Sequence, residues 1–150
     1  MVLNKILLTS IFILCIIGLS KTKAQTNSIF APVIQVNNTV ITKFEFDQRV
    51  KFLSALNFPG NNTQLAKTQL IEERLKQSES EKLNIIVSDA ELEDALKRFA
   101  SRANLSVNEF ISELNKIGIY SETFRSYIET EVIWQKLVQK KFGAQSKISN

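Results

Sequence analysis

Carboxylates are the side chains of this sequence best suited to acid–base chemistry, and they fall into three groups. The groups are Glu72-Glu73, then Glu91 with Glu93 and Asp94, then Glu129 with Glu131. General acid–base catalysis needs two carboxyl groups that converge on one partly desolvated site. Neighbouring residues of a helix point about 100° apart, and these groups lie among Lys and Arg residues. We therefore expect all three groups on solvated helix surfaces.

Histidine is absent from the 150 residues and cysteine occurs once, which removes whole classes of catalyst. Without an imidazole group, Ser-His-Asp hydrolysis, Cys-His proteolysis and His-ligated zinc are excluded. A single cysteine cannot form a disulfide within the chain. The four glycines are scattered and form no phosphate-binding loop. We expect no cofactor and no metal, and we predict that the chain is not an enzyme.

Aromatic side chains remain as candidates for function, because they can bind apolar partners. Phe46, Phe99 and Phe110 recur with aliphatic residues at helical spacing and are expected in the core. Four others lie off these stripes, in a loop or at a helix start, namely Phe52, Phe58, Tyr120 and Phe124. An exposed apolar patch of this kind is typical of a binding surface. We predict these four as the residues that bind a client polypeptide, with burial in the core as the alternative.

The N-terminal segment indicates export. Lys5 precedes an apolar run over residues 6–19, and small residues stand before a cut between Ala24 and Gln25. These features predict a secretory signal peptide over residues 1–24. The apolar run is shorter than the ~20 residues of a membrane-spanning helix. An uncleaved anchor is the alternative.

Removal of residues 1–24 changes the charge of the chain. The segment holds three of the 19 basic residues and none of the 15 acidic ones, so the net charge falls from +4 to +1. Nucleic-acid binding depends on a strongly basic surface. We therefore exclude nucleic acid as a partner, and we expect no membrane span after the signal is removed.

Local signals predict one mainly α-helical domain over residues 33–142. Residues 25–32 suit a flexible leader. Two β-prone runs around Asn37-Asn38-Thr39 predict a small N-terminal hairpin over residues 33–41, with an unpaired extended arm as the alternative. Capping boxes begin at Thr42, Ser88 and Ser106. With further caps at Thr63 and Ser121, they predict a compact bundle of five helices, at 43–56, 63–83, from 89 onward, from 107 to 117 and 121–142. Residues 143–150 suit a flexible tail.

Two of these helices differ in the polarity of their surfaces. The second half of the second helix, residues 76–82, is polar all round and predicts a solvated surface. The last helix carries apolar residues that extend beyond a single ~100° stripe, notably at residues 132–134 and 137–138. Such a helix is either enclosed by the bundle or presents apolar surface to another molecule.

The order of these elements resembles the N-terminal part of the SurA-type periplasmic chaperones. The resemblance spans residues 33–142, and Asn84 stands where relatives usually have Gly. It rests on residues 33–42 ahead of a helix, on QLIEERL at 69–75, on EKLNIIVSDAEL at 81–92, and on FISELNKIG at 110–118 followed by Tyr120, Phe124, Arg125 and Ile128.

The resemblance implies a periplasmic chaperone of a Gram-negative bacterium that holds unfolded outer-membrane proteins without ATP. Such chaperones bind aromatic-rich extended segments on the apolar surface of a helical core. Relatives continue into parvulin-type prolyl isomerase domains, and these residues contain none, so we expect no isomerase activity from them. Two alternatives stay open. One is a helical adaptor or structural module that completes its core by forming a homo-oligomer or docking on a partner. The other is a fragment of a SurA-like prolyl isomerase.

Overall fold

A computed structural model of the chain describes residues 28–143. It contains one β-hairpin and five α-helices, which confirms the mainly α-helical prediction. The signal peptide expected at residues 1–24 lies outside the described residues. In order, the elements are β1 (Pro32–Val36), β2 (Thr39–Thr42), α2 (Lys43–Ala55), α3 (Asn62–Lys82), α4 (Asp89–Ala100), the 3₁₀-helix η1 (Ser101–Ala103), α5 (Val107–Lys116) and α6 (Ser121–Phe142).

The hairpin forms because Asn37 turns the chain in the left-handed region, with φ 52°. β1 and β2 pair antiparallel, with Val36 opposite Thr39. The Thr39 hydroxyl donates a hydrogen bond to the Val36 carbonyl at 2.9 Å. Val36 and Ile41 are buried against Leu70 of α3. This small second core anchors a hairpin that would be only marginally stable alone.

Hydroxyl–glutamate capping boxes start α2, α4 and α5, as the sequence predicts. In each box the hydroxyl accepts from a backbone N–H while the glutamate accepts from the cap residue's own N–H. The helix predicted over 121–142 has the bounds of α6, but two predicted cap residues are wrong by one or two positions. Asn61 caps α3 in place of Thr63. Tyr120 occupies the N-cap position of α6 in place of Ser121, and no side chain caps that end.

Asparagine ends several segments by adopting positive φ. Asn57 and Asn84 follow α2 and α3, with φ of 55° and 50°. Asparagine tolerates this left-handed backbone better than other non-glycine residues. This explains how Asn84 replaces the glycine usual in relatives.

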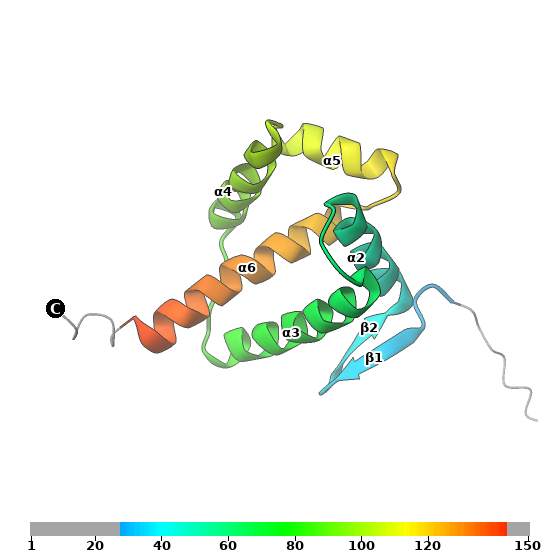
Figure 1. Cartoon of the computed structure of the whole chain (residues 1–150). Coiled ribbons are helices and arrows are strands. Elements are labelled where there is room, and N and C mark those ends of the chain that lie inside the picture. The colour runs from blue at the N-terminus through cyan, green and yellow to red at the C-terminus, as the bar shows by residue number, and fades with distance from the viewer. Residues whose placement is uncertain (1–27, 144–150) are drawn as a thin grey trace, which may run out of the picture.

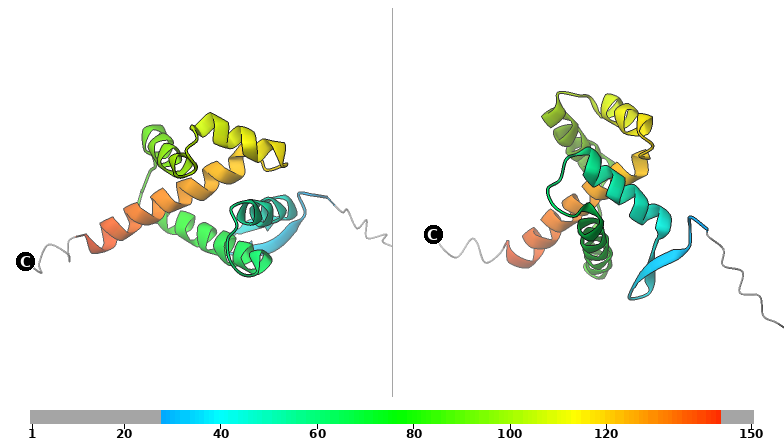
Figure 2. Two further views of the ribbon diagram at one scale, coloured as in Figure 1. Left: turned by 45° about the horizontal axis from the view of Figure 1, so that its top comes forward. Right: turned by 45° about the vertical axis from the view of Figure 1, so that its right-hand side comes forward.

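Helix α6 runs through the middle of the molecule. In Figure 1, α4 and α5 lie along one side of α6 and α3 lies along the other, while α2 packs on α3 and against the N-terminal end of α6 (Figure 2). The hairpin lies beside α2 and α3, far from the C-terminal end of α6 (Figure 1). The first half of α6 is thereby enclosed between two layers of helices.

Aromatic rings fill the core where α2, α4 and α5 meet α6. Phe124 stacks at 4.8 Å from Phe110 and 6.2 Å from Phe52, measured between ring centroids. The side chains of Phe52 and Phe124 are 0% exposed. The prediction that these two belong to an exposed patch is therefore wrong. Phe124 lies off a single apolar stripe because α6 buries several faces at once, and Phe52 is buried because α2 turns its ring toward Phe124 and Tyr127 of α6.

Candidate functional site

One side of α6 is left partly uncovered by the neighbouring helices. We call it the α6 face and define it by Tyr127, Glu131, Trp134, Val138 and Phe142. These residues are three or four positions apart and so lie on one side of the helix. Hollows flank the face on both sides, towards α3 and towards α4. The α6 face therefore lies at the bottom of a depression between α3 and α4.

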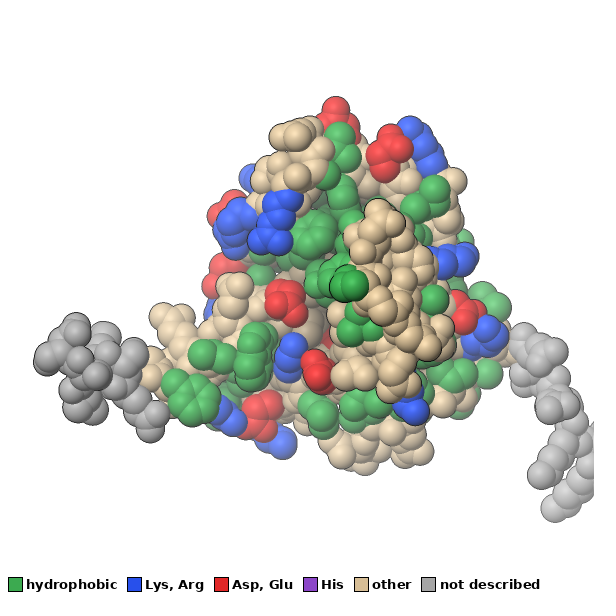
Figure 3. Space-filling view, in the orientation of Figure 1, with side chains coloured by type: hydrophobic (Ala, Val, Ile, Leu, Met, Phe, Trp, Pro, Cys, Tyr) green, Lys and Arg blue, Asp and Glu red, His purple; other side chains and the backbone are tan. Residues whose placement is uncertain are grey.

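The C-terminal end of the α6 face is apolar and exposed. Trp134, Val138 and Phe142 are 47%, 36% and 54% exposed, and Leu75 of α3 beside them is 48% exposed. A groove of about 190 Å³ separates Leu75 from the α6 residues. Figure 3 shows hydrophobic side chains gathered over this end of the helix. Patches of this kind on soluble proteins often mark sites that bind another molecule.

The charged residues around this groove pair with one another. Lys76 places its ammonium 5.3 Å from the Trp134 ring centroid and 4.0 Å from the Glu131 carboxylate. Lys141 donates to Glu79 at 2.8 Å. This hydrogen bond lowers the pKa of the Glu79 carboxyl below its ordinary value. The charged side chains at the rim thus neutralise one another. We therefore expect the apolar side chains of the groove to determine what it binds.

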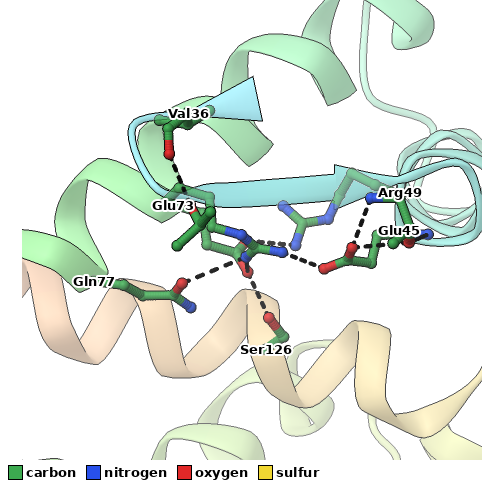
Figure 4. A network of polar contacts seen from close by, with 9 residues as sticks. Val36, Glu45, Arg49, Glu73, Gln77 and Ser126 are labelled. Atoms are coloured by element: carbon green, nitrogen blue, oxygen red, sulfur yellow. Dashed lines mark hydrogen bonds and ion pairs between the residues drawn. The ribbon is translucent and has the colours of Figure 1, made fainter. Parts of the chain in front are cut away.

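Below the other end of the α6 face lies a buried ion pair. Arg49 of α2 donates to Glu73 of α3 at 2.6 Å, and the two side chains are 3% and 2% exposed. Ser126 of α6 donates to the second oxygen of Glu73 at 2.5 Å. Arg74 adds an ion pair with Glu45. Figure 4 shows Arg49, Glu73 and Ser126 together in this network. Three helices are held together by these contacts.

The surroundings of α3 correct two predictions. Glu73 is not on a solvated surface, because a charge from another helix compensates it. Its neighbour Glu72 is exposed, as predicted. In residues 76–82, Ser80 is 5% exposed and Lys76 packs over Trp134, so this segment is not solvated all round. Lys76 and Glu79 of this segment contact α6, and the sequence of α3 alone does not reveal these contacts.

The four aromatic residues predicted to bind a client do not come together. Phe52 and Phe124 are in the core, and Phe58 is half-buried in the loop after α2. Tyr120 is 55% exposed but lies at the start of α6, far from Phe142. It contacts Phe44 at 5.4 Å between ring centroids, beside a separate hollow. The predicted cut between Ala24 and Gln25 lies outside the described residues.

Sequence reasoning missed Trp134, Val138 and Phe142 as site residues, although it contained a signal for them. The excess of apolar residues on the last helix indicates either enclosure or a presented surface. Both occur, in different halves of the helix. The helix is enclosed by its neighbours around Phe124, whereas apolar side chains from Trp134 onward are exposed to solvent.

Burial raises the pKa of Tyr127, and the negative charge of Glu131 adds to this effect. The Tyr127 hydroxyl therefore stays protonated throughout the physiological pH range.

Within residues 28–143 no cluster of acidic or sulfur ligands is arranged to hold a metal ion. No described helix is long and apolar enough to cross a membrane. The described surface offers apolar contact and hydrogen bonding.

Comparison with known proteins agrees with this architecture. A family model of the SurA N-terminal domain matches residues 30–138. The chain belongs to this family. The match confirms the predicted resemblance, and it is to the N-terminal domain of that family.

Several curated relatives carry the name Chaperone SurA. That of Pseudomonas fluorescens (strain Pf0-1) is 28% identical over 134 residues, which are 84% of this chain and 32% of the relative. That of Pseudomonas syringae pv. tomato is 30% identical over 122 residues, covering 76% of this chain and 28% of the relative. The chain thus spans about a third or less of these relatives. No solved structure gives a significant match.

Proposed function

We propose that this domain acts as an ATP-independent chaperone and that its α6 face binds unfolded polypeptide. The observation that carries the proposal is the cluster of Trp134, Val138, Phe142 and Leu75, which leaves large apolar side chains exposed in one groove. Apolar contact is non-directional and tolerates many sequences. A holding chaperone requires this tolerance, and membership of the SurA N-terminal domain family supports the role.

The size of the surface favours a short segment of polypeptide. Four half-exposed side chains of this kind offer on the order of 400 Å² of apolar area. A stable protein–protein interface buries about 800 Å² on each partner. The groove is therefore too small to hold a second copy of the chain stably by itself. An extended segment that inserts one or two rings fits the area better.

We propose that the polypeptides bound by this domain are unfolded outer-membrane proteins and that binding takes place in the periplasm. Aromatic side chains are frequent in such chains, and a ring can pack against Trp134 in offset or edge-to-face geometry. Relatives named Chaperone SurA and the resemblance of the N-terminal segment to a signal peptide support this setting. The predicted localisation and client class rest on these two observations together.

Light scattering tests the proposal directly. An outer-membrane β-barrel protein is diluted from urea into buffer with residues 25–150, which contain the whole described fold. We expect several-fold excess of the domain to suppress aggregation, and Trp134→Ser to lose most of this effect. Ile117→Ser is the matched control, because Ile117 is 57% exposed at the end of α5, away from the groove. Suppression that is absent in wild type, or equal in Trp134→Ser and wild type, would contradict the proposal.

The adaptor alternative predicts a different result. If α6 docks permanently on a second copy, sedimentation velocity will show a dimer whose formation depends on Trp134. The domain would then leave no apolar groove for clients. We expect a monomer at micromolar concentration, because the exposed apolar area is about half of what one side of a stable interface needs.

A further inference from the structure

A small polar cavity lies between α2, α3 and α6, next to the apolar groove. Its volume is about 100 Å³, and Arg49, Gln69, Tyr127 and Thr130 are among the residues that line it. Lys76 lines both this cavity and the apolar groove, so the two are neighbours along the same side of α6. A cavity of this volume is large enough for a small polar group.

Three residues that line the cavity each carry a buried polar atom with no hydrogen-bond partner among the described residues. These atoms are Nε of Arg49, Oε1 of Gln69 and Oγ1 of Thr130. The side chain of Arg49 is 3% exposed and that of Thr130 is 5% exposed. Buried polar atoms are nearly always paired in proteins. Three unpaired atoms around one cavity therefore indicate that the cavity receives a polar group.

The three atoms match one chemical group in particular. The Arg49 Nε–H can only donate, the Gln69 Oε1 can only accept, and the Thr130 hydroxyl can do either. Glu73 holds the guanidinium of Arg49 from another side, so Nε cannot readily turn away. A peptide group carries one acceptor and one donor, and so complements this arrangement.

We propose that this cavity binds a backbone amide of the extended polypeptide whose side chains occupy the apolar groove. This inference rests on the proposed function and adds a second requirement for the ligand. The carbonyl accepts from Arg49, and the amide N–H donates to Gln69. Hydrocarbon chains of lipids and detergents cannot make these bonds. The α6 face thereby selects polypeptide over other apolar molecules.

The spacing of the two subsites suits an extended chain. Thr130 and Trp134 are four residues apart on α6, which is about 6 Å along a helix axis. Two residues of an extended polypeptide span about 7 Å. A ring in the groove beside Trp134 therefore places the amide two residues away near Thr130. One short segment can occupy both subsites.

Thr130→Val tests the inference, because valine has the shape of threonine without its hydroxyl. Two probes are compared on residues 25–150. One is a capped decapeptide with phenylalanine at alternate positions, and the other is the uncharged dye N-phenyl-1-naphthylamine, which has no carbonyl or sulfonate to accept from Arg49. Trp134 is the only tryptophan of the chain, so its fluorescence reports on both. We expect about threefold to tenfold weaker peptide binding, dye binding within twofold, and no fall in the melting temperature.

Two further variants make the outcome specific. Gln69→Leu removes another unpaired atom and should weaken peptide binding in the same way. Thr68→Val is the matched control, because Thr68 lies exposed on α3 and its hydroxyl already donates to the Gln64 carbonyl. We expect this control to leave both probes unchanged.

Three results would overturn the inference. Unchanged peptide affinity with a lowered melting temperature in Thr130→Val would mean that the cavity holds only structural water. Equal weakening of peptide and dye would mean that Thr130 merely shapes the groove. Failure of wild type to bind the peptide, with dye binding intact, would overturn the proposed function as well. The first two results leave the proposed function standing.

Discussion

The two halves of α6 both carry large apolar side chains but have opposite surroundings. Around Phe124 the helix is enclosed by α2, α4 and α5, and its rings interlock with theirs. From Trp134 to Phe142, α3 runs beside the helix and Lys136 reaches Glu91 of α4, but large apolar side chains still face outward. The first half therefore stabilises the fold, while the second half is available to a partner. The same residue types serve two purposes, and the coverage by neighbouring helices decides which.

The largest expected contrast between the halves is in stability. Phe124→Ala leaves a cavity among packed rings and should cost about 3–5 kcal/mol of unfolding free energy. Phe142→Ala removes a ring that is 54% exposed and should cost less than about 1 kcal/mol. Urea unfolding followed by circular dichroism measures both. Similar losses in the two variants would contradict the division of α6 into a structural and a binding half.

The buried ion pair marks the boundary between the halves and should show the next largest effect. Glu73→Gln leaves the charge of Arg49 buried without its partner and should cost about 3 kcal/mol. The double variant Arg49→Met with Glu73→Leu should recover much of this loss, because no buried charge remains. Urea unfolding of the single and double variants distinguishes the two states. A double variant no more stable than the single one would show that the pair's polar contacts, and not its charge balance, hold α2, α3 and α6 together.

A smaller effect is expected where α4 ties down the exposed half of α6. Lys136 donates to Glu91 at 2.5 Å, and this bond, with those from Ser88, lowers the pKa of the Glu91 carboxyl to about 2. Because the folded pKa lies below the unfolded one, the contribution is present above pH 4.5 and is lost as the pH falls towards 2. The melting temperature of wild type should therefore exceed that of Glu91→Gln at pH 6. The difference should shrink towards pH 2, and a difference independent of pH would contradict this account.

The sequence predicted the local features of the fold correctly. It did not predict features that depend on contacts between residues far apart in the sequence. The capping boxes at Thr42, Ser88 and Ser106 were predictable because each involves residues three positions apart. The surroundings of Glu73 were not, because Arg49 lies 24 residues away on another helix.

The candidate site shows the same limit. Periodicity identifies which faces of a helix are apolar, but not which faces other helices cover. Phe124 and Trp134 are both aromatic residues of α6, and only the placement of α2, α4 and α5 separates the buried one from the exposed one. The sequence thus indicated that the last helix carries surplus apolar surface and misplaced the residues that present it.

Site-specific photo-crosslinking tests the central claim most directly. A benzophenone amino acid is introduced at position 138, in the apolar end of the α6 face, and in a second variant at position 117, which is more exposed but remote from the face (57% against 36% for the native side chains). Each is irradiated with an outer-membrane β-barrel protein freshly diluted from urea. The account predicts strong crosslinking from position 138 and little from position 117. Equal yields from the two positions, or crosslinking from position 117 alone, would contradict the assignment of the α6 face as the surface that binds unfolded polypeptide.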